Sequence, residues 1–314
     1  MIARPIAAAP DIGAADHGSA SIWSDALWRI RHDPTTLVAL AILGVLVVAS
    51  ASADLLTEHL FRTTYSAQDF SLSYRGPSLD EPKLWLGTDT LGRSEIVRLL
   101  HGGRVSLFVG AFGSLVALTI GMTVGMTAGY FRGCWDDVAV WLITTIESVP
   151  LIYLLIMIGL YFKLDAISLT VFLGSVAWLG AANLARGQTI ALREREYVTA
   201  ARTTGAGPLR ILLRHVLPNI LPLMIVVLML GVGGIILAES AISFLGFGIQ
   251  PPQPSWGNML SGSTSFYFRG PHLIVFPGLA ITITVLCVFL IGDGLRDALD
   301  PRLRGTESVS GRSA

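Results

Sequence analysis

Six long apolar runs are the feature that most restricts how this chain of 314 residues can fold. A helix needs about 20 consecutive apolar residues to cross a hydrocarbon core roughly 30 Å thick. Within lipid, such a segment must also satisfy its own backbone polar groups, which a helix does. We therefore predict an all-α membrane protein with six transmembrane helices, at residues 36–56, 104–130, 138–162, 166–184, 217–245 and 272–291.

The composition supports this prediction. Hydrophobic residues make up 52% of the chain and charged residues 14%, with a mean hydropathy of +0.64. One soluble core could not bury that much apolar surface. The formal net charge is zero, so nothing favours nucleic acid as a partner. Cys134 and Cys287 lie far apart in the sequence, and we interpret them as packing residues rather than as a disulfide pair.

The distribution of Lys and Arg predicts the orientation, because short cytoplasmic loops hold the excess of these residues. Basic residues gather at both ends of the chain and in two loops that six spans place on one side, whereas the two short opposite loops hold only Lys163 and Arg269. Both termini are therefore expected in the cytoplasm, with the first span an uncleaved anchor. The predicted segments are a partly disordered cytoplasmic tail at 1–35, the first span at 36–56, an external loop at 57–103, a five-span core at 104–292 with a cytoplasmic loop at 185–216, and a cytoplasmic tail at 293–314.

The cytoplasmic loop contains the stretch "EYVTAARTTGAGPLRILLRHVLPNILP", from residue 196 to 222. Its first half predicts a helix with one small face beside a more polar face. Gly205 is suited to a left-handed position after this helix, and Pro208 to the first turn of the next one. We expect an L-shaped protrusion. The small face would hold Tyr197, Ala200, Ala201 and Thr204, and the neighbouring face Arg195, Thr199 and Arg202.

The second helix of this stretch carries Arg210 and Arg214 one turn apart. Its apolar residues, Leu209, Leu212, Leu213 and Val216, are expected to be buried. A basic amphipathic loop of this kind can also simply lie on anionic lipid headgroups, and the pattern alone does not decide between the two interpretations.

The stretch resembles the EAA loop of bacterial binding-protein-dependent ABC importers. The pattern of that loop is Glu-Ala-Ala, three residues, Gly, nine residues, and Ile-x-Leu-Pro. This chain has the Ala, Gly and Leu-Pro positions at the family spacing, with Thr199 in place of the Glu and His215 in place of the Ile. The resemblance implies a coupling helix that sits in a groove of an ATPase subunit. The coupling residues it implies are Tyr197, Thr199, Ala200, Ala201, Arg202, Gly205, Leu217 and Pro218.

Three further motifs narrow the resemblance to the C-type permeases of dipeptide, oligopeptide and nickel importers. They are "LGTDTLGRSEIVRL" from Leu86, "AISFLGFGIQPPQPSWG" from Ala241 and "GDGLRDALDPRLR" from Gly292. The resemblance implies a multi-pass permease of the bacterial inner membrane, with residues 104–292 as its core permease domain. It also implies four partners: a second homologous permease, two cytoplasmic ATPase subunits that bind ATP and Mg, and an external solute-binding protein.

The chain itself is not expected to hydrolyse ATP or to hold a cofactor. A phosphate-binding loop needs the pattern G-x-x-x-x-G-K-[ST], in which the Lys contacts the terminal phosphates. The sequence has only two lysines, Lys83 after Pro and Lys163 after Phe, and neither fits this pattern. It also has no metalloprotease H-E-x-x-H and no G-x-S-x-G nucleophile elbow, so the enzyme interpretation has no support.

Two carboxylates fall inside predicted spans, Glu147 in the third and Glu239 in the fifth. Such residues are costly and often functional, so either could lie on the translocation pathway. Each could instead be hydrogen-bonded within the protein, and we favour this structural interpretation. The alternative function is a secondary transporter in which these two residues carry protons, and its uptake would collapse with the proton gradient rather than depend on ATP.

Glycines and prolines inside the predicted spans lead to two further expectations. Gly121, Gly125 and Gly129 form small-xxx-small steps that permit close helix contact, either with a partner permease or within the subunit. Prolines interrupt three predicted spans and could mark bends around a pathway, although prolines also bend helices that have no such role. They are Pro150, Pro222 and Pro277.

Overall fold

The computed structural model describes residues 22–299. Within that range the protein is helical, with one isolated bridge between Thr88 and Ser94 and no named β-strand. Two expectations lie outside the described residues: the disorder of residues 1–21, and the end of the C-terminal tail at 300–314. The α-helices are α1 (Ile22–His32), α2 (Pro34–Ala51), α3 (Ala53–Leu56), α4 (Glu95–Phe131), α5 (Cys134–Glu147), α6 (Leu151–Tyr161), α7 (Ala166–Val176), α8 (Leu179–Arg193), α9 (Glu196–Thr203), α10 (Pro208–Ile211), α11 (Leu217–Phe244), α12 (Trp256–Met259), α13 (Ser263–Phe266) and α14 (His272–Leu299).

The helices long and apolar enough to cross a membrane agree with the predicted spans. Of the described helices, four pass this test alone: α2, α4, the continuous helix Pro208–Phe244 and α14. Two bent pairs pass when each is taken together, α5 with α6 and α7 with α8, at bends of 77° and 41°. Counting each pair as one span gives the six predicted crossings.

The prolines differ in their effect. Pro150 precedes α6 at the sharp bend, where a ring without an N–H cannot continue the helix of α5. Pro222 and Pro277 instead lie inside the continuous helices α11 and α14. Of these three prolines, Pro150 therefore lies at a sharp bend, and the other two do not interrupt their helices.

α4 begins at Glu95, well before the second apolar run, so it occupies part of the segment expected to be a loop. Its first turns carry charged and polar side chains that are nevertheless buried, although Glu95 Oε1 and Arg98 Nη1 have no hydrogen-bond partner among the described residues. Arg98 lies 3.6 Å from a carboxylate oxygen of Asp89, and the His101 ring is 3.1 Å from the Thr57 hydroxyl. Hydropathy cannot show such partners, and for that reason the sequence places the start of this helix too late.

The glycines of α4 pack within the subunit. A β-carbon at Gly125 would lie against the Ala182 carbonyl oxygen, and one at Gly121 or Gly129 would crowd the backbone of α8 in the same way. The small-residue stripe therefore lets α4 and α8 approach closely, which settles the use of these three positions. α4 also packs against α7 and α11, while α11 packs against α14.

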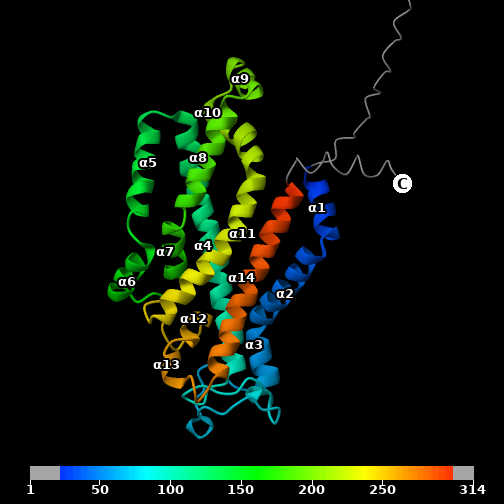
Figure 1. Ribbon diagram of the computed structural model, residues 1–314, viewed down its shortest axis with the longest axis vertical. Helices are drawn as coiled ribbons and strands as arrows, with labels where there is room; N and C mark the ends of the chain where they lie inside the picture. Colours follow the sequence, from blue (N-terminus) through cyan, green and yellow to red (C-terminus); the bar gives the residue numbers. More distant parts are fainter. Residues whose placement is uncertain (1–21, 300–314) are drawn as a thin grey trace, which may run out of the picture.

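The bundle has two distinct ends (Figure 1). One carries α9, α10, α1 and the end of α14, and we call it the α9 end. The opposite end carries α12, α13 and the connection between α3 and α4. α1 packs against α14, so the segment just before the first span is held at the α9 end.

Candidate coupling loop and membrane cavity

α9 ends in the turn that the sequence predicts. Gly205 has a φ of +86°, in the left-handed region. Its N–H donates to the Arg202 carbonyl at 3.1 Å, and the Ala206 N–H donates to the Ala201 carbonyl at 3.0 Å. This pair of bonds is a Schellman motif, which satisfies the last carbonyls of a helix. Pro208 then occupies the first turn of α10, as expected.

Five of the eight predicted coupling residues lie on α9 and differ in exposure. Thr199, Ala200 and Arg202 are exposed, Tyr197 is 43% exposed, and Ala201 is half-buried. Leu217 and Pro218 lie in the first turn of α11, where Leu217 is half-buried and Pro218 is exposed. α9 therefore presents the small side chains of Thr199 and Ala200 to its surroundings, beside the larger ones of Tyr197 and Arg202.

α10 is not a separate second helix. It runs through a π-helical turn, Leu212–Val216, directly into α11, so the second arm of the protrusion is the membrane span itself. Two of the four apolar residues expected to be buried here are not, since Leu209 is 69% and Leu213 53% exposed. Leu212 and Val216 are buried with Ile211. The spacing did not reveal which side of this helix faces α4 and α8.

Val198 attaches α9 to the bundle. Its side chain is fully buried and belongs to the same apolar cluster as Tyr130, at the end of α4, and Ile211. Two arginines add to this contact. Arg202 places its guanidinium carbon 5.7 Å from the centre of the Tyr130 ring, and Arg193 donates to the Tyr130 carbonyl at 2.7 Å. The exposed side of α9 is therefore backed by a firm connection to α4 and α8.

An ion pair ties α8 to α5. Arg186 donates through Nε and Nη2 to the two carboxylate oxygens of Asp136, at 2.5 and 2.7 Å. Both groups are mostly shielded from solvent. Such two-point pairs fix orientation as well as distance. Sequence reasoning missed this pair and Val198, although a lone valine on a helix rich in polar and small residues was a usable signal for burial.

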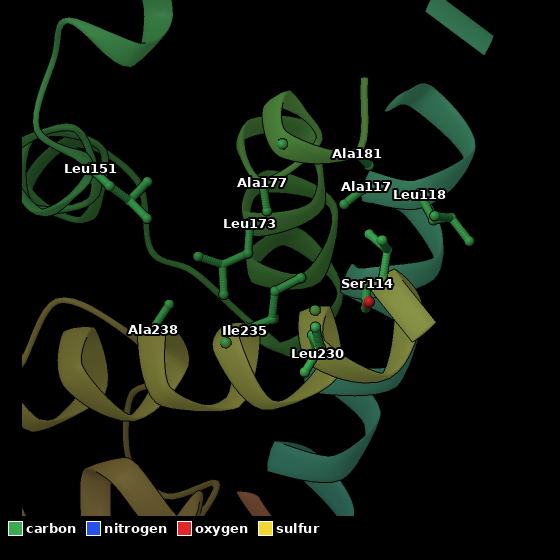
Figure 2. A pocket seen from close by; sticks show the side chains of 14 residues that line it. Ser114, Ala117, Leu118, Leu151, Leu173, Ala177, Ala181, Leu230, Ile235 and Ala238 are labelled. Carbon is green, nitrogen blue, oxygen red and sulfur yellow. The ribbon is translucent and has the colours of Figure 1, made fainter. Parts of the chain in front are cut away.

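An apolar cavity of about 390 Å³ lies between α4, α6, α7, α8 and α11. In Figure 2, Leu151, Leu173 and Ile235 point toward this space from three different helices. All lining side chains except that of Ser114 are apolar or are glycine hydrogens, and the Ser114 hydroxyl donates to the Leu228 carbonyl at 2.9 Å. The cavity therefore presents no charged side chain to whatever occupies it.

Neither of the two predicted intramembrane carboxylates is among the cavity-lining residues. Glu239 is fully buried, and its two oxygens accept hydrogen bonds from Ser106 and Ser243 at 2.9 and 2.8 Å. Glu147 is exposed at the end of α5 and accepts a 3.4 Å bond from the Asn183 side chain. The structure thus places the two residues in different surroundings and does not bring them together.

A bundle of up to six crossings with a rigidly held EAA-like helix at one end defines a permease subunit of a binding-protein-dependent transport system. Comparison with known families agrees. Residues 121–305 match the family described as "Binding-protein-dependent transport system inner membrane component". Residues 21–77 match "N-terminal TM domain of oligopeptide transport permease C". The chain belongs to this permease family.

Individual relatives place it in one branch of the family. It is 36% identical over 284 residues to the oligopeptide transport system permease protein OppC of Haemophilus influenzae, covering 90% of both chains. It is also 36% identical to OppC of Escherichia coli K12, over 90% of this chain and 92% of that one. The glutathione transport system permease protein GsiD of E. coli O1:K1 is 35% identical over 283 residues, 90% of this chain and 91% of GsiD.

These similarities establish an OppC-type ABC transporter permease, a multi-pass protein of the inner membrane. The relatives are permease subunits rather than enzymes. The comparisons give no support to the alternative of a proton-coupled secondary transporter that uses Glu147 and Glu239.

Proposed function

We propose that this subunit forms half of a pathway for short peptides and is driven by a separate ATPase that docks on α9. The observation that carries the proposal is the architecture of α9. Its exposed surface includes the small side chains of Thr199 and Ala200, while the buried Val198 fixes the helix to α4. A small exposed face permits close approach of another protein, and a fixed rear face lets a push be transmitted.

The proposed orientation puts the α9 end in the cytoplasm. α9, α1 and the end of α14 share this end of the bundle (Figure 1). These segments carry basic side chains: Arg202 on α9, Arg29 and Arg31 on α1, and Arg296 near the end of α14. Since basic residues favour the cytoplasmic side, both termini and the proposed ATPase site are cytoplasmic in this account, and the opposite end is external.

Movement of α9 would reach the cavity by two routes. One runs through Val198 and Tyr130 into α4, which supplies Ser114 to the cavity. The other runs through α10 into α11, because Pro208–Phe244 is one continuous helix that supplies Ile235. ATP binding would draw the two ATPase subunits together and favour the outward-open state, since a ligand shifts an equilibrium by its differential affinity for the two states. Hydrolysis would restore the inward-facing state.

The proposed substrate class rests on the relatives and on the cavity. The relatives are named for oligopeptide and glutathione transport. The lining beside Leu173 and Ile235 is almost wholly apolar, so it offers no charged partner that would select among solute side chains. Selection would then lie mainly in the external solute-binding protein, and a second, homologous permease would complete the pathway. ATP and Mg would be bound by the ATPase partners.

The test replaces Ala201 by tryptophan in the assembled transporter. A bulky side chain on this helix should prevent close docking, so uptake and binding-protein-stimulated ATP hydrolysis should both fall, or the ATPases should be lost on purification. Ala201→Ser is the matched control and should behave as the wild type. Membrane insertion should be normal in both variants.

A loop that only lies on lipid headgroups gives a different pattern. It should tolerate Ala201→Trp and respond instead to joint replacement of Arg202, Arg210 and Arg214 by alanine. Normal transport by the Trp variant with its ATPases bound would refute docking on α9.

A further inference from the structure

We propose that Glu239 is a positioning residue that holds the segment 246–259 over the outer end of the cavity. We call this segment, which includes α12, the cap segment. The proposal deepens the transport function proposed above, because it assigns the closure of the same pathway at the end opposite α9. In this account Glu239 acts through two serines and does not contact solute.

Two hydrogen-bond relays connect the Glu239 carboxylate to the cap segment. In the first, the Ser106 hydroxyl of α4 donates to Glu239 Oε2 at 2.9 Å and accepts from the Trp256 backbone N–H at 3.2 Å. In the second, the Ser243 hydroxyl of α11 donates to Glu239 Oε1 at 2.8 Å and accepts from the Ile249 backbone N–H at 3.2 Å. Each serine thus stands between the carboxylate and one backbone amide of the cap segment.

The chemistry of the hydroxyl group explains why a carboxylate is needed here. A serine has one O–H to donate and two lone pairs that accept. Each oxygen of the Glu239 carboxyl group accepts one of these hydroxyls, so the O–H of both Ser106 and Ser243 is turned toward it. The lone pairs are then left for the backbone amides of Ile249 and Trp256. An amide side chain at position 239 could accept from only one of the two hydroxyls through its oxygen and would offer N–H groups to the other.

Burial makes these relays decisive. Glu239, Ser106 and Ser243 are buried almost completely, as is the Trp256 side chain. No bulk water is at hand to replace a lost partner, and an unsatisfied buried polar group is costly. The cap segment also fits closely, since a β-carbon at Gly248 or Gly257 would collide with Ser243 or Ser240 on α11. The segment is therefore seated in one position.

The cap segment closes onto the cavity through an apolar cluster. Ile249 belongs to the same buried cluster as Leu173 and Ile235, and both of these line the cavity. Phe247 lies against Gly159 of α6, on another wall of this region. Release of the cap segment would therefore loosen the apolar packing that separates the cavity from the external end. Holding it in place keeps that end shut.

The test measures hydrogen exchange of the peptide containing Ile249 and Trp256 in the complete transporter. Ser106→Ala and Ser243→Ala each remove one relay, and Glu239→Gln disturbs the pair while keeping the side-chain size. We expect exchange to become roughly three- to tenfold faster in all three, because one neutral hydrogen bond shifts an opening equilibrium by about that factor. Ser240→Ala is the comparison variant: its hydroxyl donates a longer bond of 3.5 Å to Glu239 Oε2 but accepts from no backbone amide of the cap segment, so exchange should change less than in the relay variants.

Uptake gives the second measurement. Glu239→Gln should reduce uptake of neutral and cationic peptides in the same proportion, with the ATPases still bound. Unchanged exchange in Ser106→Ala, Ser243→Ala and Glu239→Gln would overturn the proposal, and so would a loss confined to cationic peptides. If Glu239→Gln does not assemble, the two serine variants decide the question against Ser240→Ala.

The same measurements separate this proposal from ATPase docking. Ala201→Trp should leave exchange of the cap segment at the wild-type rate when no nucleotide is present. Normal transport by Ala201→Trp, together with faster exchange in the Glu239 and serine variants, would refute docking on α9 but not the role of Glu239. Reduced transport by Ala201→Trp, together with unchanged exchange in those variants, would refute the role of Glu239 but not docking on α9.

Discussion

Replacing Gly205 by valine tests the backbone conformation of the turn after α9 without introducing a side-chain clash. A β-carbon added at this position meets no atom within 4 Å, so the space is open and only the backbone opposes a side chain. The φ of +86° lies in the left-handed region, which costs an L-residue about 1–2 kcal/mol, and a β-branched residue is especially unsuited to it. A cost of that size disfavours the native turn by a factor of roughly 5 to 30.

Asparagine at the same position is the matched control. It is similar in size to valine but visits the left-handed region readily. In liposomes containing the partner permease, the ATPases and the binding protein, Gly205→Val should lose much of its peptide uptake and of its stimulated ATP hydrolysis. Gly205→Asn should keep most of both. Equal activity of the Val and Asn variants would show that α9 does not need this turn to function.

Three further outcomes follow from the attachment of α9 and from the cavity. Val198→Ala removes buried methyl groups that contribute about 1–2 kcal/mol of packing, so it should loosen the attachment of α9. The amount of peptide taken up per ATP hydrolysed should fall while the ATPases stay bound. An unchanged uptake per ATP would contradict the role of Val198. Arg186→Lys loses the two-point pair with Asp136, so thermal inactivation of the purified subunit should occur at a lower temperature, with a smaller loss in the Asp136→Asn background; equal losses in both backgrounds would show that the pair is not the cause. Exchanging only the binding protein among compatible systems should change the substrate profile, and an unchanged profile after a functional exchange would move selectivity into the cavity.

The sequence was sufficient where one physical property dominated. Length and apolarity predicted the helices that are long and apolar enough to cross a membrane, up to six when each bent pair counts as one span, and the conformational freedom of Gly205 predicted the turn that closes α9. Both features depend on a few neighbouring residues. Neither needs any knowledge of what packs against them.

Features that depend on distant partners could not be predicted in this way. The start of α4 was placed too late because its buried polar side chains are held by Asp89, outside the apolar run, and by Thr57, which is 44 residues before His101 in the sequence. Leu209 was expected to be buried because spacing reveals a face but not its neighbours. The same holds for Glu239, since only the structure shows the serines that occupy both of its oxygens.

ATPase docking requires that the exposed side of α9 contacts an ATPase subunit. A photoreactive amino acid at Ala200, which is exposed on α9, tests this contact directly in the membrane-embedded transporter. We expect a covalent adduct with the ATPase, identified by mass spectrometry, and no such adduct from the same probe at Trp141, an exposed position on the span helix α5. Adducts with lipid alone from position 200, in a transporter that still hydrolyses ATP on adding the binding protein, would contradict it.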